Sequence, residues 1–170
     1  MERASLLTVL ADIAQHGGCR LLPPVGPVPG LRVPDDLRLF YEACGGAILF
    51  EGAWTISGPE QLVPASPRLL GPELAAEVAA AQPDDLTNGC FVFAETGPGG
   101  TASLVVVDLH PARAGRYYDA FWDRYGLVGE MPVIAVGVAE VLRRLLDTRG
   151  EPAAGIGPVY GDAYDAGPPA

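Results

Sequence analysis

Two separate segments of this 170-residue chain, 31–46 and 89–109, constrain its fold more than any other feature. The first predicts a short helix, because Asp35 and Asp36 favour a helix start and the apolar residues after them recur at helical spacing before two glycines. The second predicts a β-hairpin, in which two apolar runs are joined by the glycine-rich stretch 97–100. Together they are typical of a small α+β domain, and neither supplies a catalytic constellation.

The rest of the chain adds helices and strands to these two segments. Amphipathic or alanine-rich spacing predicts helices over 5–15, 72–81 and 138–148, and apolar or aromatic runs predict strands over 47–50, 54–56 and 115–122. In the first helix we expect Ser5 as the cap and an apolar face of Leu6, Leu7, Leu10, Ile13 and Ala14. The run 104–109 predicts a central strand covered on both faces, whereas 72–81 is mostly alanine and should pack weakly.

These elements predict one α+β domain over residues 1–150. We expect a mainly antiparallel sheet of about four to six strands flanked by helices. After Gly150 the chain turns to Ala, Gly, Pro, Tyr and Asp, which predicts a flexible C-terminal tail over 151–170.

The charge of the chain limits its partners. With a net charge of −10 and a pI of about 4.5, the chain should repel nucleic acid and anionic membrane surfaces. It should attract basic partners and associate with them quickly at low salt, although the same charge can serve solubility alone.

The cysteines and the N-terminus predict an unbridged protein without a targeting segment. Cys19, Cys44 and Cys90 are odd in number and lack CxxC spacing, so neither a disulfide framework nor a zinc site is expected. The apolar run 6–10 is followed by Asp12 and by no small-residue cleavage site. We expect no signal peptide, no membrane span and a cytoplasmic location.

Catalytic chemistry finds little support in the residues. Asp108 and His110 would share one face of a strand and could be two ligands of a metal, but no third ligand is evident and the turn at Pro111 explains them as well. The stretch 97–100 leads into a strand in a chain without lysine, which favours a hairpin turn over a phosphate loop. We expect no enzyme, no metal and no cofactor, and keep a small hydrolase with an unrecognised site as the least favoured alternative.

Acidic and aromatic residues around the hairpin and the strand after it predict a protein-binding surface. Aromatic side chains rimmed by acids can form the centre of an interface with a basic partner. The candidate residues are Glu95, Tyr118, Asp119, Trp122, Asp123 and Glu130. The alternative is that alternate aromatics belong to the core and the acids only solvate loops.

Two groups of motifs carry a resemblance to a known family. A helix-and-turn motif is formed by Val33, Pro34, Leu37, Phe40, Gly45 and Gly46, and a hairpin motif by Gly99, Gly100, Asp108 and Leu109. Two positions depart from the pattern, since Cys44 replaces a usually polar residue, often Asn, and Thr101 a frequently acidic one. With the order of elements over 6–146, the motifs resemble the SUKH superfamily, whose best-known branch is the Smi-Knr type.

The resemblance implies a binding role on an α+β fold. The superfamily includes fungal regulators of cell-wall synthesis and many bacterial immunity proteins that neutralise partner toxins, often nucleases. It therefore implies a non-catalytic protein that occludes a toxin domain, expected here to be basic. The alternative is a regulatory or scaffolding domain without a toxin partner. We expect a monomer or a weak dimer.

Overall fold

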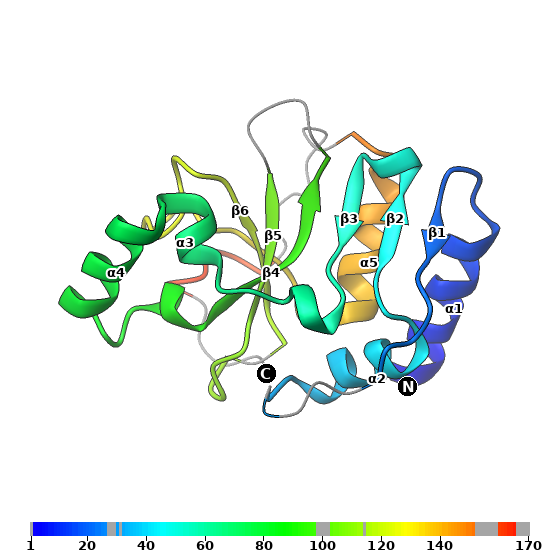
Figure 1. Cartoon of the computed structure of the whole chain (residues 1–170), viewed down its shortest axis with the longest axis horizontal. Coiled ribbons are helices and arrows are strands. Elements are labelled where there is room, and N and C mark those ends of the chain that lie inside the picture. Colours follow the sequence, from blue (N-terminus) through cyan, green and yellow to red (C-terminus); the bar gives the residue numbers. More distant parts are fainter. Residues whose placement is uncertain are drawn as a thin grey trace.

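The computed structural model describes residues 2–26, 30, 32–97, 103–113, 115–151 and 160–165. This part of the chain forms one antiparallel sheet whose strands lie side by side in chain order (Figure 1). The strands are β1 Arg20–Leu21, β2 Ala47–Leu49, β3 Trp54–Ile56, β4 Cys90–Thr96, β5 Leu104–Asp108, β6 Tyr117–Ala120 and β7 Val133–Ala135. The predicted α+β class and antiparallel pairing are confirmed, with seven strands where about four to six were expected.

The helices agree with the prediction except near the N-terminus and around residue 65. They are α1 Glu2–Gln15, α2 Asp35–Ala43, α3 Ala65–Leu70, α4 Pro72–Ala81 and α5 Val138–Asp147. The expected cap at Ser5 is wrong, because α1 begins earlier and Ser5 lies inside it. The sequence did not predict α3, which is only 6 residues long.

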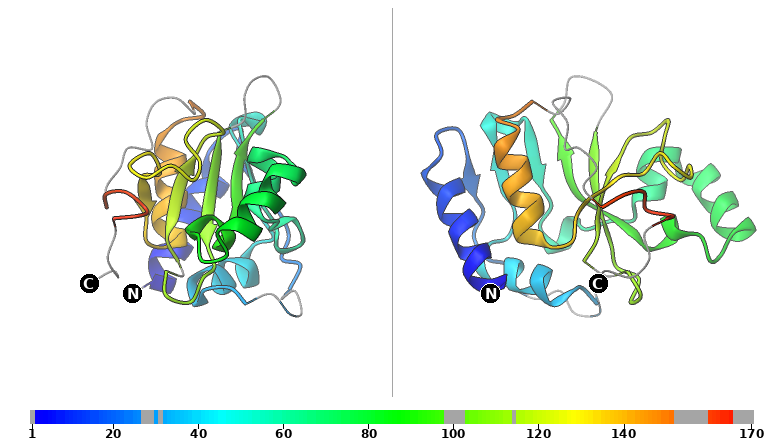
Figure 2. Two further views of the ribbon diagram at one scale, coloured as in Figure 1. Left: turned by 90° about the vertical axis from the view of Figure 1, so that its left-hand side faces the viewer. Right: turned by 180° about the vertical axis from the view of Figure 1, so that it is seen from behind.

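One face of the sheet, which we call the helical face, is covered by α1, α2 and α5. Figure 1 shows α5 behind β2 and β3, and the view from behind in Figure 2 shows α1 beside it. The apolar stripe on α5 is buried as predicted. On α1 the prediction is partly wrong, because Leu7 and Ala14 are exposed and Val9 is buried. Burying each large apolar side chain here contributes roughly 1.5–3 kcal/mol.

Aromatic rings tie α2 to the middle of the sheet on this face. Phe40 of α2 lies 6.0 Å from Phe93 of β4, and Phe93 lies 5.0 Å from Tyr117 of β6, measured between ring centroids. All three side chains are fully buried. The edge-on and tilted geometries are those that aromatic pairs prefer, so the rings fix how α2 sits on the sheet.

Strand β5 is the central strand that the sequence predicted, covered on both faces. Val105 and Val107 belong to the core under the helical face, whereas Leu104 and Val106 belong to a second core on the opposite side. The neighbouring β4 shifts register between Val92 and Ala94 against β5. This bulge places both Phe93 and Ala94 on the helical face, which a strict two-residue alternation would not do.

The opposite face, which we call the loop face, is covered mainly by irregular chain. Its core includes Ala65 of α3, Tyr125 and Met131 from the β6–β7 connection, and Ala163 near the C-terminus. Helix α4 packs weakly, as expected, since Ala75 is its buried residue. In Figure 1, α3 and α4 lie at the end of the molecule opposite α1.

One prediction on this face needs correction, and the structure places part of the predicted tail. The aromatic strand expected over 115–122 is shorter, because the backbone turns after Ala120 and the amides of Arg124 and Tyr125 donate to the carbonyl of Phe121 at 3.0 and 2.9 Å. Residues 160–165, inside the predicted flexible tail, pack on the domain and pair with Pro132. The rest of that tail, 152–159 and 166–170, and the hairpin connection 98–102 lie outside the described residues.

Candidate interaction surface

The predicted binding residues do not form one surface, because Tyr118 belongs to the core. Its side chain has no exposed area, and its hydroxyl donates to Oδ2 of Asp108 at 2.9 Å. Burial is the main cause of the raised pKa of Tyr118, and the adjacent Asp108 carboxylate adds to it. The alternative reading of alternate aromatics as core residues holds for Tyr118, and also for Tyr117 and Tyr125.

Glu95 and Asp119 point to opposite faces of the sheet. Glu95 lies in register with Leu104 and ion-pairs with Arg68 of α3 at 3.1 Å, so it belongs to the loop face. Asp119 lies in register with Val105, a residue of the helical-face core. Burial raises the pKa of Asp119, while the positive charge of Arg124 opposes that rise. These two acids therefore cannot flank one contact patch.

The three remaining candidates lie together on residues 121–131, which we call the docking loop. Trp122 is 55% exposed, and Asp123 and Glu130 are also exposed. The structure adds two residues that sequence reasoning missed, Leu127 and Val128, which are 52% and 70% exposed. Three large apolar side chains and two carboxylates are thus exposed on one loop.

Two buried residues anchor the docking loop to the loop-face core. Its buried members are Tyr125 and Met131, both in the loop-face core. The Tyr125 hydroxyl lies 3.1 Å from Oγ of Ser66 on α3 and donates to the carbonyl of Thr87 at 3.3 Å. Gly126 and Gly129 both have positive φ, 81° and 85°, which glycine adopts without strain. The glycines turn the chain so that the apolar pair between them points away from the core side of the loop.

Charge on the docking loop is only partly neutralised. Arg124 lies beside Asp123, with Nε 3.7 Å from Oδ1, and its guanidinium carbon lies 5.7 Å from the centre of the Phe121 ring. Both partners of the ion pair are about half exposed. An exposed pair of this kind is weak, so Asp123 can exchange Arg124 for a cation of a partner at little cost.

Asp108, considered above as a metal ligand, is a fully buried structural carboxylate. It accepts hydrogen bonds from the His110 amide at 2.8 Å, from Nε of Arg113 at 2.7 Å and from the Tyr118 hydroxyl. These bonds fix the turn between β5 and β6. Among the described residues, no three His, Cys, Asp or Glu side chains gather in a way that could hold a metal ion.

The thiols are also poorly suited to nucleophilic chemistry. Cys44 and Cys90 are buried, and burial raises the pKa of both thiols, that of Cys90 most strongly. A thiol with a raised pKa carries little thiolate at neutral pH. Cys19 is partly exposed, and its sulfur lies 3.7 Å from Nδ1 of His16 and accepts a hydrogen bond from the Phe50 amide at 3.4 Å.

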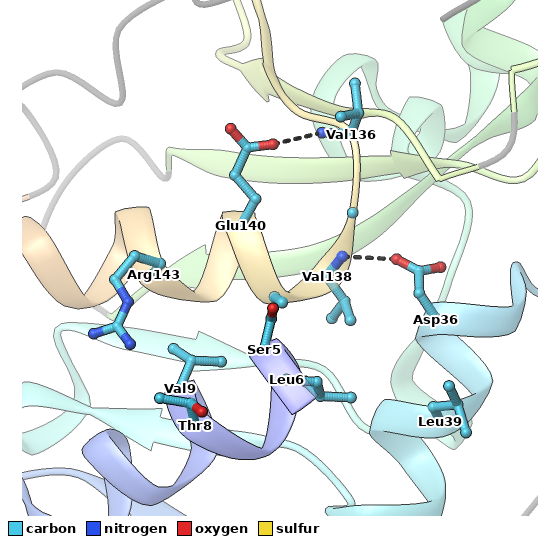
Figure 3. A pocket seen from close by; sticks show the side chains of 12 residues that line it. Ser5, Leu6, Thr8, Val9, Asp36, Leu39, Val136, Val138, Glu140 and Arg143 are labelled. Atoms are coloured by element: carbon cyan, nitrogen blue, oxygen red, sulfur yellow. Dashed lines mark hydrogen bonds between the residues drawn. The ribbon is translucent and has the colours of Figure 1, made fainter. Parts of the chain in front are cut away.

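A second surface feature is an open groove of about 540 Å³ between α1, α2 and the start of α5 (Figure 3). Its apolar lining includes Leu6, Val9 and Val138. Two carboxylates at its edge are already engaged, because Asp36 accepts from the Val138 amide at 2.7 Å and Glu140 from the Val136 amide at 3.1 Å. They cap the N-terminus of α5, and the groove shows no catalytic grouping.

No helix among the described residues is long and apolar enough to cross a membrane. The fold and the surface define an acidic α+β domain with an exposed apolar loop at residues 121–131.

Comparison with known proteins gives the family. The chain is 34% identical over 168 residues to Immunity protein YokJ of Bacillus subtilis (strain 168), and the alignment covers 95% of this chain and 96% of that protein. The chain belongs to the family of this immunity protein, which confirms the predicted SUKH membership. No protein-family model matches the sequence, and no solved structure matches it.

Proposed function

We propose that this protein is a non-catalytic immunity protein that binds and neutralises a protein toxin. The observation that carries the proposal is the identity of 34% to an immunity protein along 95% of the chain. An alignment of that extent spans nearly the whole chain rather than one shared motif. The buried, engaged state of Asp108 and the raised pKa values of Cys44 and Cys90 support a role that depends on binding.

The docking loop is the face that we propose for the toxin. Interfaces depend on a few large apolar or aromatic side chains that lose water on binding, surrounded by polar residues. Trp122, Leu127 and Val128 provide such a centre, and Asp123 and Glu130 provide an acidic rim. Because the whole chain carries −10, a basic toxin domain would be attracted from a distance and oriented toward this rim.

Neutralisation would follow from occlusion. A nuclease must present a basic cleft to its nucleic acid, and an acidic partner seated on that cleft excludes the substrate by charge and by bulk. At most one of Glu95 and Asp119 could join the contact, since they lie on opposite sides of the sheet, and the other would contribute to long-range attraction only. The contact itself would depend on the apolar centre, so tight binding should persist at high salt while its rate of formation falls.

The test is capture from the native lysate, followed by co-expression of the captured protein with variants of this chain. We expect a toxic basic domain that wild type neutralises and that Trp122→Ser with Val128→Ser does not. The control is Leu74→Ser on α4, where a half-exposed leucine lies outside the docking loop. Capture of wall-synthesis or signalling proteins instead would favour the regulatory alternative, and equal loss in the control would refute the face.

A further inference from the structure

Residues 160–165 lie against the docking loop, although more than 25 positions separate the two in the sequence. Ala163 is buried in the loop-face core together with Tyr125 and Met131. The right-hand view of Figure 2 shows this C-terminal piece, in red, on the side of the sheet away from α1. Besides bonds to Glu140 and Asp85, the segment makes hydrogen bonds at both ends of one short stretch, the loop tip 127–130.

The far end of the tip is held by two hydrogen bonds at Met131 and a third at Val133. The Met131 amide donates to Oδ2 of Asp162 at 2.8 Å, and the Ala163 amide donates to the Met131 carbonyl at 2.8 Å. The adjoining Val133 amide donates to the carbonyl of Gly161 at 2.8 Å. The segment thus pairs with the chain at the start of β7 through an isolated β-bridge, Pro132 with Asp162, and the Asp162 side chain adds a bond that backbone pairing alone would not make.

The near end of the tip is held at Gly126 by Tyr164. The Tyr164 hydroxyl lies 3.2 Å from the Gly126 carbonyl and 3.2 Å from Oδ2 of Asp85, two acceptors between which it can share its proton. The Gly126 amide in turn points at the sulfur of Met131 at 3.1 Å. The Tyr164 amide donates to Oδ1 of Asp162 at 3.0 Å, so the two side chains that hold the tip are themselves connected.

We propose that Asp162 and Tyr164 are positioning residues that hold the tip 127–130 in its binding conformation. They reach the partner only through Leu127, Val128 and Glu130, which the proposed function places in the contact. A tip fixed at both ends loses less conformational freedom when a partner binds, and binding is stronger by the free energy that ordering would have cost. We call the hydrogen bonds of Asp162 and Tyr164 to the two ends of the tip the clamp. The role of the clamp in binding rests on the proposed function, but the clamp itself is a property of the free protein.

The clamp is tested first without any partner, by backbone ¹⁵N relaxation of the whole chain. In the wild type we expect order parameters of about 0.85 at residues 127–130, as in rigid backbone. Asp162→Ala should lower them toward about 0.6, Tyr164→Phe should lower them partly, and Asp162→Asn, which keeps an oxygen acceptor, should restore much of the loss. The matched control is Asp165→Ala, which removes the same charge from an exposed position of the same segment.

A loss of tip order in Asp162→Ala and Tyr164→Phe, with unchanged order in β4 and β5 and in the control, is the expected result. Unchanged order at the tip in both variants would overturn the clamp, whatever happens to the melting temperature. Once the toxin is captured, Asp162→Ala should weaken its binding by roughly tenfold. Equal affinity of a variant whose tip is disordered would refute the docking loop as the contact and leave the clamp standing.

Discussion

The two faces of the sheet are built differently, and the difference separates stability from recognition. On the helical face, α1, α2 and α5 bury continuous stripes of large side chains against the strands. On the loop face, one short helix, the docking loop and the segment 160–165 enclose a smaller core. Regular packing fixes the first face, whereas individual hydrogen bonds from side chains fix much of the second. The second face can therefore vary its exposed residues without loss of the fold.

The largest loss of stability should come from a substitution on the helical face. Phe40→Ala removes a fully buried ring that contacts both Tyr41 and Phe93, and should lower the free energy of unfolding by about 3–5 kcal/mol. Leu127→Ala on the docking loop should change it by less than about 0.5 kcal/mol. Urea denaturation followed by circular dichroism measures both. Similar losses at the two positions would show that the faces do not differ as described.

A smaller loss of stability should come from replacing Asp108, the fully buried carboxylate on the loop face. Asp108→Ala leaves the buried Tyr118 hydroxyl and the Arg113 guanidinium without their acceptor, and should cost about 3 kcal/mol. Asp123→Ala, which removes a half-exposed partner of Arg124, should cost less than about 0.5 kcal/mol. The same denaturation experiment applies, and a stable Asp108→Ala protein would contradict the structural role of this carboxylate.

The smallest effect should be a pH dependence centred on Asp119. Burial raises its pKa in the folded protein above that of the unfolded chain, so folding favours the protonated form. The contribution of Asp119 to stability is therefore greatest at low pH. It falls as the pH rises from the ordinary pKa of an Asp carboxyl, about 3.9, through the raised pKa of the folded protein. Asp119→Asn should be slightly more stable than wild type at neutral pH. No gain there, together with an unchanged pH profile of unfolding, would contradict the burial of this carboxylate.

The buried residues of the helical face were predicted well from the sequence, because the spacing of apolar residues within one helix marks its buried side. The spacing of Leu37, Phe40 and Tyr41 marks the buried side of α2, and the same argument holds for Val138 and Leu142 on α5. The error at α1 has a simple cause: Leu7 and Val9 both fit an apolar pattern, and only the angle at which α1 meets its neighbours decides which one is buried.

The loop face could not be predicted in the same way, because its contacts join distant parts of the chain. Nothing near Tyr118 in the sequence shows that its hydroxyl meets Asp108, and nothing near Tyr164 shows that it reaches Gly126. One local pattern was available and was missed. Leu127 and Val128 stand between two glycines, and a large apolar pair at a glycine-flanked turn indicates exposure.

The most direct test of the central claim is a hydrogen-exchange comparison of the chain alone and bound to its captured toxin. The proposed function predicts that binding slows exchange at the amides of residues 121–131 and leaves α1 and α5 unchanged. The apolar groove between α1, α2 and α5 is the alternative contact surface. Protection confined to that groove, with the docking loop unaffected, would contradict the account and place recognition on the helical face.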